Sequence, residues 1–136
     1  MTRGELNCNP LNIRRVAGTT WEGQRAEQTD NAFVQFRTIE FGLRAAFVLL
    51  HTYATKYHAN CIRDIISRWA PPSENDTRAY IRSVCALTGF GGREKLTETE
   101  WPALVRAMAV VESRMHLDEG TLKTAYNLYL NLKPKN

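Results

Sequence analysis

The sequence is poor in cysteine, and its cysteines are badly spaced for a disulfide framework or a zinc site. Its 136 residues include Cys8, Cys61 and Cys85, an odd number at wide intervals. Small disulfide-stapled domains and zinc modules use paired cysteines at short, regular spacing. We therefore expect three reduced, mostly buried thiols.

The histidines show no ligand spacing either. His51, His58 and His116 are far apart, and no H-x-x-x-H pattern occurs. A metal site built from them would need such a pattern or a nearby carboxylate cluster. A nucleophile formed by Cys8 with one of these histidines, as in a wall amidopeptidase, lacks any flanking motif. The sequence thus predicts no metal and no cofactor.

Long hydrophobic segments are also missing. The longest apolar stretch, AAFVLL at residues 45–50, is far too short to span a bilayer. The first ten residues, MTRGELNCNP, lack the apolar core of a signal peptide. We expect a protein that is synthesised in the cytoplasm without a signal peptide and does not insert into a membrane. If its target is the cell wall, a virion or another delivery route must carry it there.

No run of basic residues is present. The chain has 18 Lys and Arg against 14 Asp and Glu, a formal net charge of +4. A mild excess of this kind favours any anionic polymer, including nucleic acid, a membrane surface or a bacterial wall. Because no recognition-helix or RNA-binding signature occurs, nucleic-acid binding is the weakest of these alternatives.

The hydrophobic pattern changes near residue 40. Before that point, glycines and a proline separate short, mixed segments that are typical of loops and small strands. After it, apolar residues recur at helical spacing. We predict a single domain over residues 1–136, of the α+β class and predominantly α-helical. An irregular, β-containing lobe would occupy 1–39 and a helical lobe 40–131.

Five helices are expected in the helical lobe. They are predicted at about 40–57, 60–70, 77–90, 101–115 and 118–130. Ser73 with Asp76 is a candidate start for the third of these, and Gly89 would end it. A capping box formed by Thr97 and Glu100 would precede the fourth.

Several motifs of the first half resemble a known group of enzymes. The order is NCNPLNIR, then Trp21 and Gly23 as W-x-G, then FVQFRTIEFGLRA and TYATKY. This order resembles bacterial wall glucosaminidases and their lysozyme-like relatives over about residues 7–57. The resemblance implies a lysozyme-like fold. The segments RGELNCNPLNIR and ISRWAPPSENDTRAYIRSV are also similar to a family of small phage and prophage proteins, often described as structural or virion proteins, over about residues 3–84.

Glu112 ends a strongly apolar helical run. The segment LVRAMAVVES resembles the signature helix of lytic transglycosylases and glucosaminidases, which ends in Glu-Ser. Lysozyme-like enzymes carry this helix before the Asn-rich turn, whereas here only six residues precede Asn7. Because domain termini often lie close together, we hypothesise a circularly permuted fold in which the Glu112 helix packs beside the N-terminal turn.

The resemblance implies that Glu112 is a general acid for glycosidic cleavage. Apolar neighbours in its helix would disfavour the charged carboxylate and raise its pKa, as this chemistry requires. A second group must stabilise the charge on the sugar carbon, either another carboxylate or the acetamido group of the substrate itself. The candidate second carboxylates are Asp30, Glu74 and Glu22.

Several side chains are candidates for contacting a sugar. Trp21 and Tyr80 could stack on sugar faces, and asparagine amides could hold acetamido groups. The asparagines concerned are Asn7, Asn9 and Asn12.

Each of these residues also has a plainer explanation. Glu112 could turn to solvent and pair with Arg114 or Lys123, and the asparagines could simply stabilise a turn. The tryptophans could be core residues, and Glu74 could stabilise the start of a helix through the helix dipole.

We expect a phage or prophage protein that binds peptidoglycan glycan strands and cleaves them as a glycosidase or lytic transglycosylase. Two alternatives stay open. One is a non-catalytic virion or secretion-associated protein that docks on the wall, with other phage or secretion-system proteins as partners. The other is a nucleic-acid-binding protein. Whether the chain is catalytic is left open by the sequence.

Overall fold

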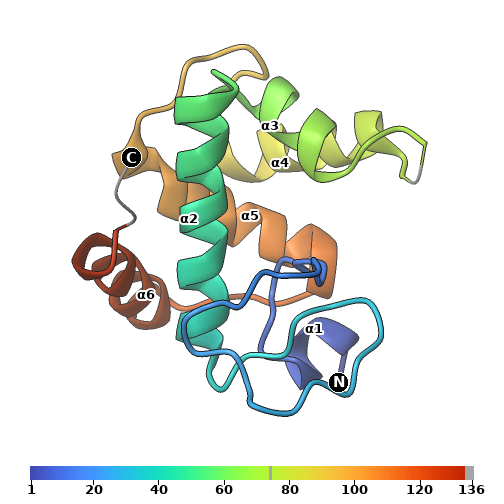
Figure 1. The fold of residues 1–136 in the computed structure, drawn as a ribbon. Helices are drawn as coiled ribbons and strands as arrows, with labels where there is room; N and C mark the ends of the chain where they lie inside the picture. The colour runs from blue at the N-terminus through green and yellow to red at the C-terminus, as the bar shows by residue number, and fades with distance from the viewer. Residues whose placement is uncertain (74, 134–136) are drawn as a thin grey trace.

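The computed structural model describes residues 1–73 and 75–133, and these fold mainly into helices around α2 and α5 (Figure 1). The elements are α1 (Arg3–Leu6), α2 (Ile39–Lys56), α3 (Ile62–Trp69), α4 (Thr77–Thr88), the 3₁₀ turn η1 (Glu98–Glu100), α5 (Trp101–Ser113) and α6 (Glu119–Asn131). The predominantly α-helical class predicted from the sequence is confirmed.

The boundaries of α4 show which local signals decide where a helix starts. Asp76, not Ser73, is the N-cap, and its carboxylate accepts a hydrogen bond from the main-chain N of Ala79 at 3.1 Å. The prediction of Ser73 as the cap is therefore wrong by about one turn. Gly89 ends the helix as predicted, because its φ of 80° lies in the left-handed region that glycine adopts without strain.

The predicted capping box before α5 is confirmed, although it forms a separate turn. Thr97 and Glu100 cap η1 reciprocally, and Trp101 begins α5 directly after it. Pro102 occupies the first turn of α5, where its missing N–H removes no helical hydrogen bond.

Helix α5 lies at the centre of the packing. It contacts α1, α2, α4, α6 and η1, and its side chains at Leu104, Val105 and Met108 are fully buried. Helix α2 packs most extensively against α6. With neighbours on several sides, α5 is apolar around most of its circumference until its last turn, which carries Glu112.

The N-terminal region is less regular than any helix. Helix α1, which the sequence pattern did not predict, is capped by Thr2 and Glu5. Within the described part of the chain, β structure amounts to two isolated antiparallel bridges, Arg14 with Phe33 and Gln24 with Phe36. Residues 7–38 otherwise form turns and loops packed against the lower ends of α2 and α5 (Figure 1).

None of the described helices is both long enough and apolar enough to cross a lipid bilayer.

Candidate functional site

A cavity of about 320 Å³ lies between the N-terminal loops, α2, α3 and the last turn of α5. Four aromatic side chains line it: Trp21, Phe33, Tyr53 and Trp69. Its polar lining consists of Asn12, Arg14, Asn75 and Glu112. Aromatic walls combined with a few polar groups are common in small-molecule sites.

The carboxylate of Glu112 is held by two donors. The hydroxyl of Tyr80 donates to Oε2 at 3.0 Å, and Nδ2 of Asn12 lies 3.3 Å from Oε1 and donates to the main-chain O of Glu112 at 3.1 Å. Burial raises the pKa of Glu112 above its ordinary value. The hydrogen bonds from Asn12 and Tyr80 and the positive charge of Arg14 oppose this rise without cancelling it.

Asn12 can serve both protonation states of this acid. Its amide donates through Nδ2 to the carboxylate and, after half a turn, would accept through Oδ1 from the protonated form. In the present arrangement Oδ1 is buried without a hydrogen-bond partner among the described residues. Asn12 has a φ of 50°, a left-handed conformation that asparagine tolerates better than most residues.

Close packing joins the N-terminal segment to the end of α5. Gly4 lies against Ser113 so tightly that a Cβ at this position would overlap the Ser113 hydroxyl. That hydroxyl in turn donates to the main-chain O of Pro10 at 2.8 Å. These contacts bring Asn12 to Glu112 across a separation of 100 residues.

Two of the aromatic walls are fixed by their own contacts. The rings of Tyr53 and Trp69 meet edge to face, with centroids 5.9 Å apart and planes at 68°. Nε1 of Trp69 donates to the main-chain O of Leu11 at 3.3 Å, which ties α3 to the N-terminal loop. The walls are thus anchored before any ligand enters.

Asn7 and Asn9 are structural residues of the N-terminal loop. Asn9 is fully buried; Nδ2 donates to the main-chain O of Ile13 and Val34, and Oδ1 accepts from the main-chain N of Ile13. Asn7 donates to the carboxylate of Asp30 at 3.0 Å. Neither lines the cavity, so Asn12 is the member of the predicted asparagine set that does.

Asp30 is engaged elsewhere. Both of its carboxylate oxygens accept from Arg3, at 2.7 and 2.6 Å, and the Arg3 guanidinium holds the pKa of Asp30 far below its usual range. Asp30 is not part of the cavity lining. Its contacts are those of a residue that organises the loop, and the structure offers no path from its carboxylate to Glu112.

The remaining predicted residues divide between the cavity and other places. Trp21 is half-buried and lines the cavity. Tyr80 is 7% exposed and does not line the cavity, so it reaches Glu112 through its hydroxyl and does not offer its ring as a stacking surface. Glu22 is exposed and does not line the cavity. Glu74 lies outside the described residues.

Sequence reasoning missed several lining residues. Arg14, Phe33, Tyr53 and Asn75 all sit in segments singled out only as marks of resemblance, and none of the four was given a role in the site. They come from four separate stretches of the chain that meet only in the fold, so no periodicity relates them.

The described residues contain no cluster of three or more His, Cys, Asp or Glu side chains that could hold a metal ion. The cysteines described are all free thiols.

Comparison with known proteins finds a relative in a bacteriophage. Over 113 residues, which are 82% of this chain and 71% of the relative, the sequence is 42% identical to Protein P5 of Pseudoalteromonas phage PM2. No protein-family model matches the chain.

Proposed function

The chain belongs to the family of Protein P5 of Pseudoalteromonas phage PM2, and from this premise we propose that it is a phage protein that binds cell-wall glycan at the Glu112 cavity and cleaves it there. The observation that carries the proposal is a carboxyl with a raised pKa at the edge of an aromatic-lined cavity. Glycosidic cleavage needs such an acid, because the leaving oxygen must receive a proton near neutral pH.

Glu112 acts as the general acid in this proposal. Its proton passes to the glycosidic oxygen while Tyr80 and Asn12 hold the carboxyl in place, and the carboxylate that results keeps both donors. The donors therefore become stronger partners as negative charge forms, since hydrogen bonds to charged groups exceed those to neutral groups.

Positive charge on the sugar carbon needs a second group. Among the described residues, Glu112 is the one carboxylate that lines the cavity. The acetamido group of the substrate, or one of its hydroxyls, is then the group proposed to close on the sugar carbon. Asn75 lines the cavity, and its amide is the group proposed to hold such a substituent by a hydrogen bond.

We extend the proposal to the fold. An acid at the end of an apolar helix, facing a cleft formed with an irregular lobe, is the arrangement implied by the lysozyme-like resemblance. Here the helix lies late in the chain and the lobe early, which supports a circular permutation. The close packing of Gly4 on Ser113 supports the junction that such a permutation requires.

Clearing of purified cell walls tests the catalytic proposal. The wild-type protein is expected to reduce the turbidity of walls, and Glu112→Gln to lower the rate by about 10²–10⁴-fold, the usual contribution of a positioned acid. Glu119→Gln, at an exposed glutamate of α6, is the matched control and should clear walls normally. Circular dichroism must show both variants folded. Normal clearing by folded Glu112→Gln would refute the role of Glu112.

A non-catalytic wall-docking protein is the second candidate. The observation in its favour is that Asn12 binds the main-chain carbonyl of Glu112 as well as its carboxylate, a pattern that would suit a purely structural clasp. This candidate predicts that the wild-type protein sediments with purified walls and leaves their turbidity unchanged.

A further inference from the structure

A row of aromatic rings leads from the cavity to the surface. Trp69 and Tyr53 line the cavity, and Tyr53 meets Tyr57 edge to face with ring centroids 6.3 Å apart. Tyr57 stands at the end of α2 and is 40% exposed. Ring contacts therefore connect the cavity lining to an exposed aromatic side chain at the end of α2.

Cations cover the outer end of this row. The guanidinium carbon of Arg68 lies 3.7 Å from the centre of the Tyr57 ring, and Nζ of Lys56 lies 5.4 Å from it. The charge of Arg68 reaches back to Tyr53, whose pKa it lowers against the larger upward effect of burial. No carboxylate of the described residues lies within ion-pair distance of Arg68. Its charge is thus available to an incoming anion.

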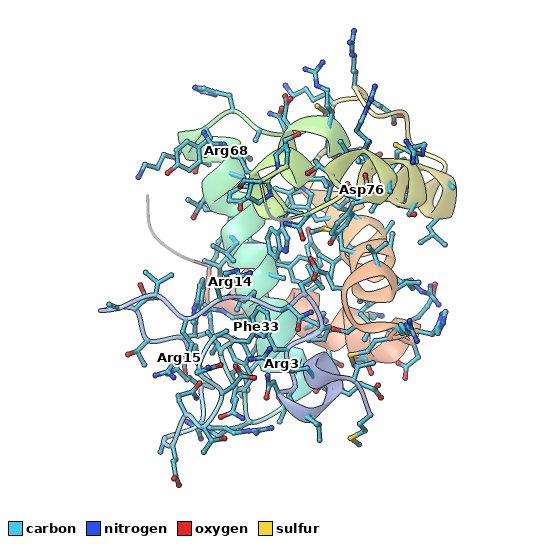
Figure 2. All side chains as sticks on the ribbon, turned by 90° about the vertical axis from the view of Figure 1, so that its right-hand side faces the viewer. Arg3, Arg14, Arg15, Phe33, Arg68 and Asp76 are labelled. Atoms are coloured by element: carbon cyan, nitrogen blue, oxygen red, sulfur yellow. The ribbon has the colours of Figure 1, made fainter. Side chains whose placement is uncertain are left out.

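A second pair of arginines lies over Phe33, an aromatic residue of the cavity lining. The guanidinium carbons of Arg3 and Arg14 lie 4.5 and 5.3 Å from the centre of the Phe33 ring. Figure 2 shows Arg68 towards the top of the view, Arg14 and Phe33 below it, and Arg3 and Arg15 lower still. Arginines that lie over rings thus occur both within the cavity lining, at Arg14, and beside it, at Arg68.

We propose that this arginine-flanked row is a binding path for an anionic glycan strand, which enters the cavity over Tyr57 and Arg68 and carries carboxylates that Arg68 recognises. The inference rests on the proposed function, since it names the substrate class of the same site. The guanidinium of Arg68 lies over the Tyr57 ring and makes no ion pair with a carboxylate of the described residues, so its N–H groups can recognise a carboxylate in a bidentate manner. Stacking also reduces the entropy that the arginine loses on binding.

The geometry favours a glycan over a nucleic acid. Bases bind to single-stranded sites by stacking on open ring faces, whereas the faces of Tyr57 and Phe33 are occupied by cations. The neighbouring rings also meet edge to face, so they form no parallel platform for successive bases. The arginines are few and lie apart from one another. This arrangement suits a polymer that carries its charges on separate side groups better than one with a charge at every backbone unit.

Binding to purified sacculi tests this path independently of cleavage. All variants are made in the Glu112→Gln background, so that the strands stay intact whether or not the wild-type protein cuts them. Four probes are compared: native sacculi, sacculi whose carboxylates have been amidated, a neutral chitin oligosaccharide and a single-stranded oligonucleotide. The matched control is Arg106→Gln, at an exposed arginine that lines a separate cavity with no residue in common with that of Glu112.

Arg68→Gln should weaken binding to native sacculi by about threefold to fivefold, the usual range for an exposed cation–π or ion-pair contact. Charge reversal in Arg68→Glu should weaken it further, whereas Arg106→Gln should bind normally. Amidated sacculi should bind weakly and equally to all variants. The path is refuted if Arg68→Gln and Arg68→Glu bind native sacculi normally, or lose as much affinity on amidated sacculi. Tighter binding to the oligonucleotide than to sacculi, lost in Arg68→Gln, would reassign the row to nucleic acid.

Failure of the proposed function has a different signature. If the wild-type protein leaves walls uncleared, cleavage is refuted while the binding series still decides the glycan path. If walls are cleared and the Arg68 variants bind normally, the path alone is refuted.

Discussion

Replacing Tyr80 with phenylalanine removes one of the two hydrogen bonds to the Glu112 carboxylate, and the cost in stability should grow with pH. The hydroxyl is buried and lies 3.0 Å from Oε2, so water cannot readily replace it. A hydrogen bond to a charged group contributes about 1.5–3 kcal/mol, whereas one between neutral groups contributes about 1 kcal/mol. The additional stabilisation from a charged hydrogen bond is therefore lost only when Glu112 is ionised.

The sign follows from the direction of the pKa shift. Burial raises the pKa of Glu112 in the folded state above its unfolded value. Stability associated with this group is therefore fully present in acid and is lost as the pH rises from about 4.3 through the folded pKa. In Tyr80→Phe the ionised form loses more stabilisation than the protonated form, so the pKa of Glu112 rises further.

Urea unfolding at a series of pH values measures this effect. Tyr80→Phe should cost about 1 kcal/mol near pH 4 and about 2–2.5 kcal/mol near pH 8. In a Glu112→Gln background the cost should lose its pH dependence. Tyr126→Phe is a matched control, because the Tyr126 hydroxyl donates to the main-chain O of Glu98, which does not titrate. A cost for Tyr80→Phe that is constant across pH would refute the coupling between this hydroxyl and the acid.

Two further predictions concern the loops that carry the site. Gly42→Ala should lower the free energy of unfolding by about 3 kcal/mol, because the new Cβ would overlap the main-chain O of Cys8. Gly120→Ala is the control in the same denaturation assay. Because α6 has room for a Cβ at this position, the substitution should be neutral or stabilising. Asp30→Asn should lower stability at neutral pH by removing the ion pair with Arg3. The deficit should shrink progressively as the pH falls from about 4, where the unfolded carboxyl takes up its proton, towards the much lower pKa of the folded carboxyl; a deficit that stays constant as the pH is lowered below about 4 would contradict this role.

The helical half of the fold could be predicted because its signals are local. The stripe of Ile62, Ile65 and Ile66 predicted α3, and these side chains are buried in the structure. The capping box of Thr97 and Glu100 is also where it was expected. Such features depend on residues within one or two turns, so the sequence alone reveals them.

The N-terminal region was harder to predict because long-range contacts determine it. Nothing in the sequence distinguishes Asn7 and Asn9 from Asn12. In the structure, Asn7 and Asn9 form hydrogen bonds within the N-terminal region, whereas Asn12 forms one with Glu112. Asp30 looked like a free carboxylate until the structure placed Arg3 beside it. Which partner each polar group finds depends on how loops that have no period fold back on one another.

The sequence predicted the direction of the Glu112 pKa and some of the residues that line the cavity, whereas the role of Glu112 as an acid stays a prediction. The apolar run before Glu112 indicated a carboxyl with a raised pKa, and its direction agrees with the structure. The role of Tyr80 was assigned to its ring, whereas its hydroxyl makes the contact. No pattern indicated Arg68 and Tyr57, because their stacking joins α3 to the end of α2.

The hydrogen bond from Asn12 to Glu112 also determines when, during synthesis of the chain, the cavity can form. These partners are 100 residues apart, so a ribosome must deliver nearly all of the helices before the cavity can close around the acid. Contacts of such long range form late in folding, since their loop-closure entropy is offset only once other structure is in place. A nascent or truncated chain that ends before α5 therefore lacks both the acid and the central helix of the packing, so the cavity can form only after this region has been synthesised.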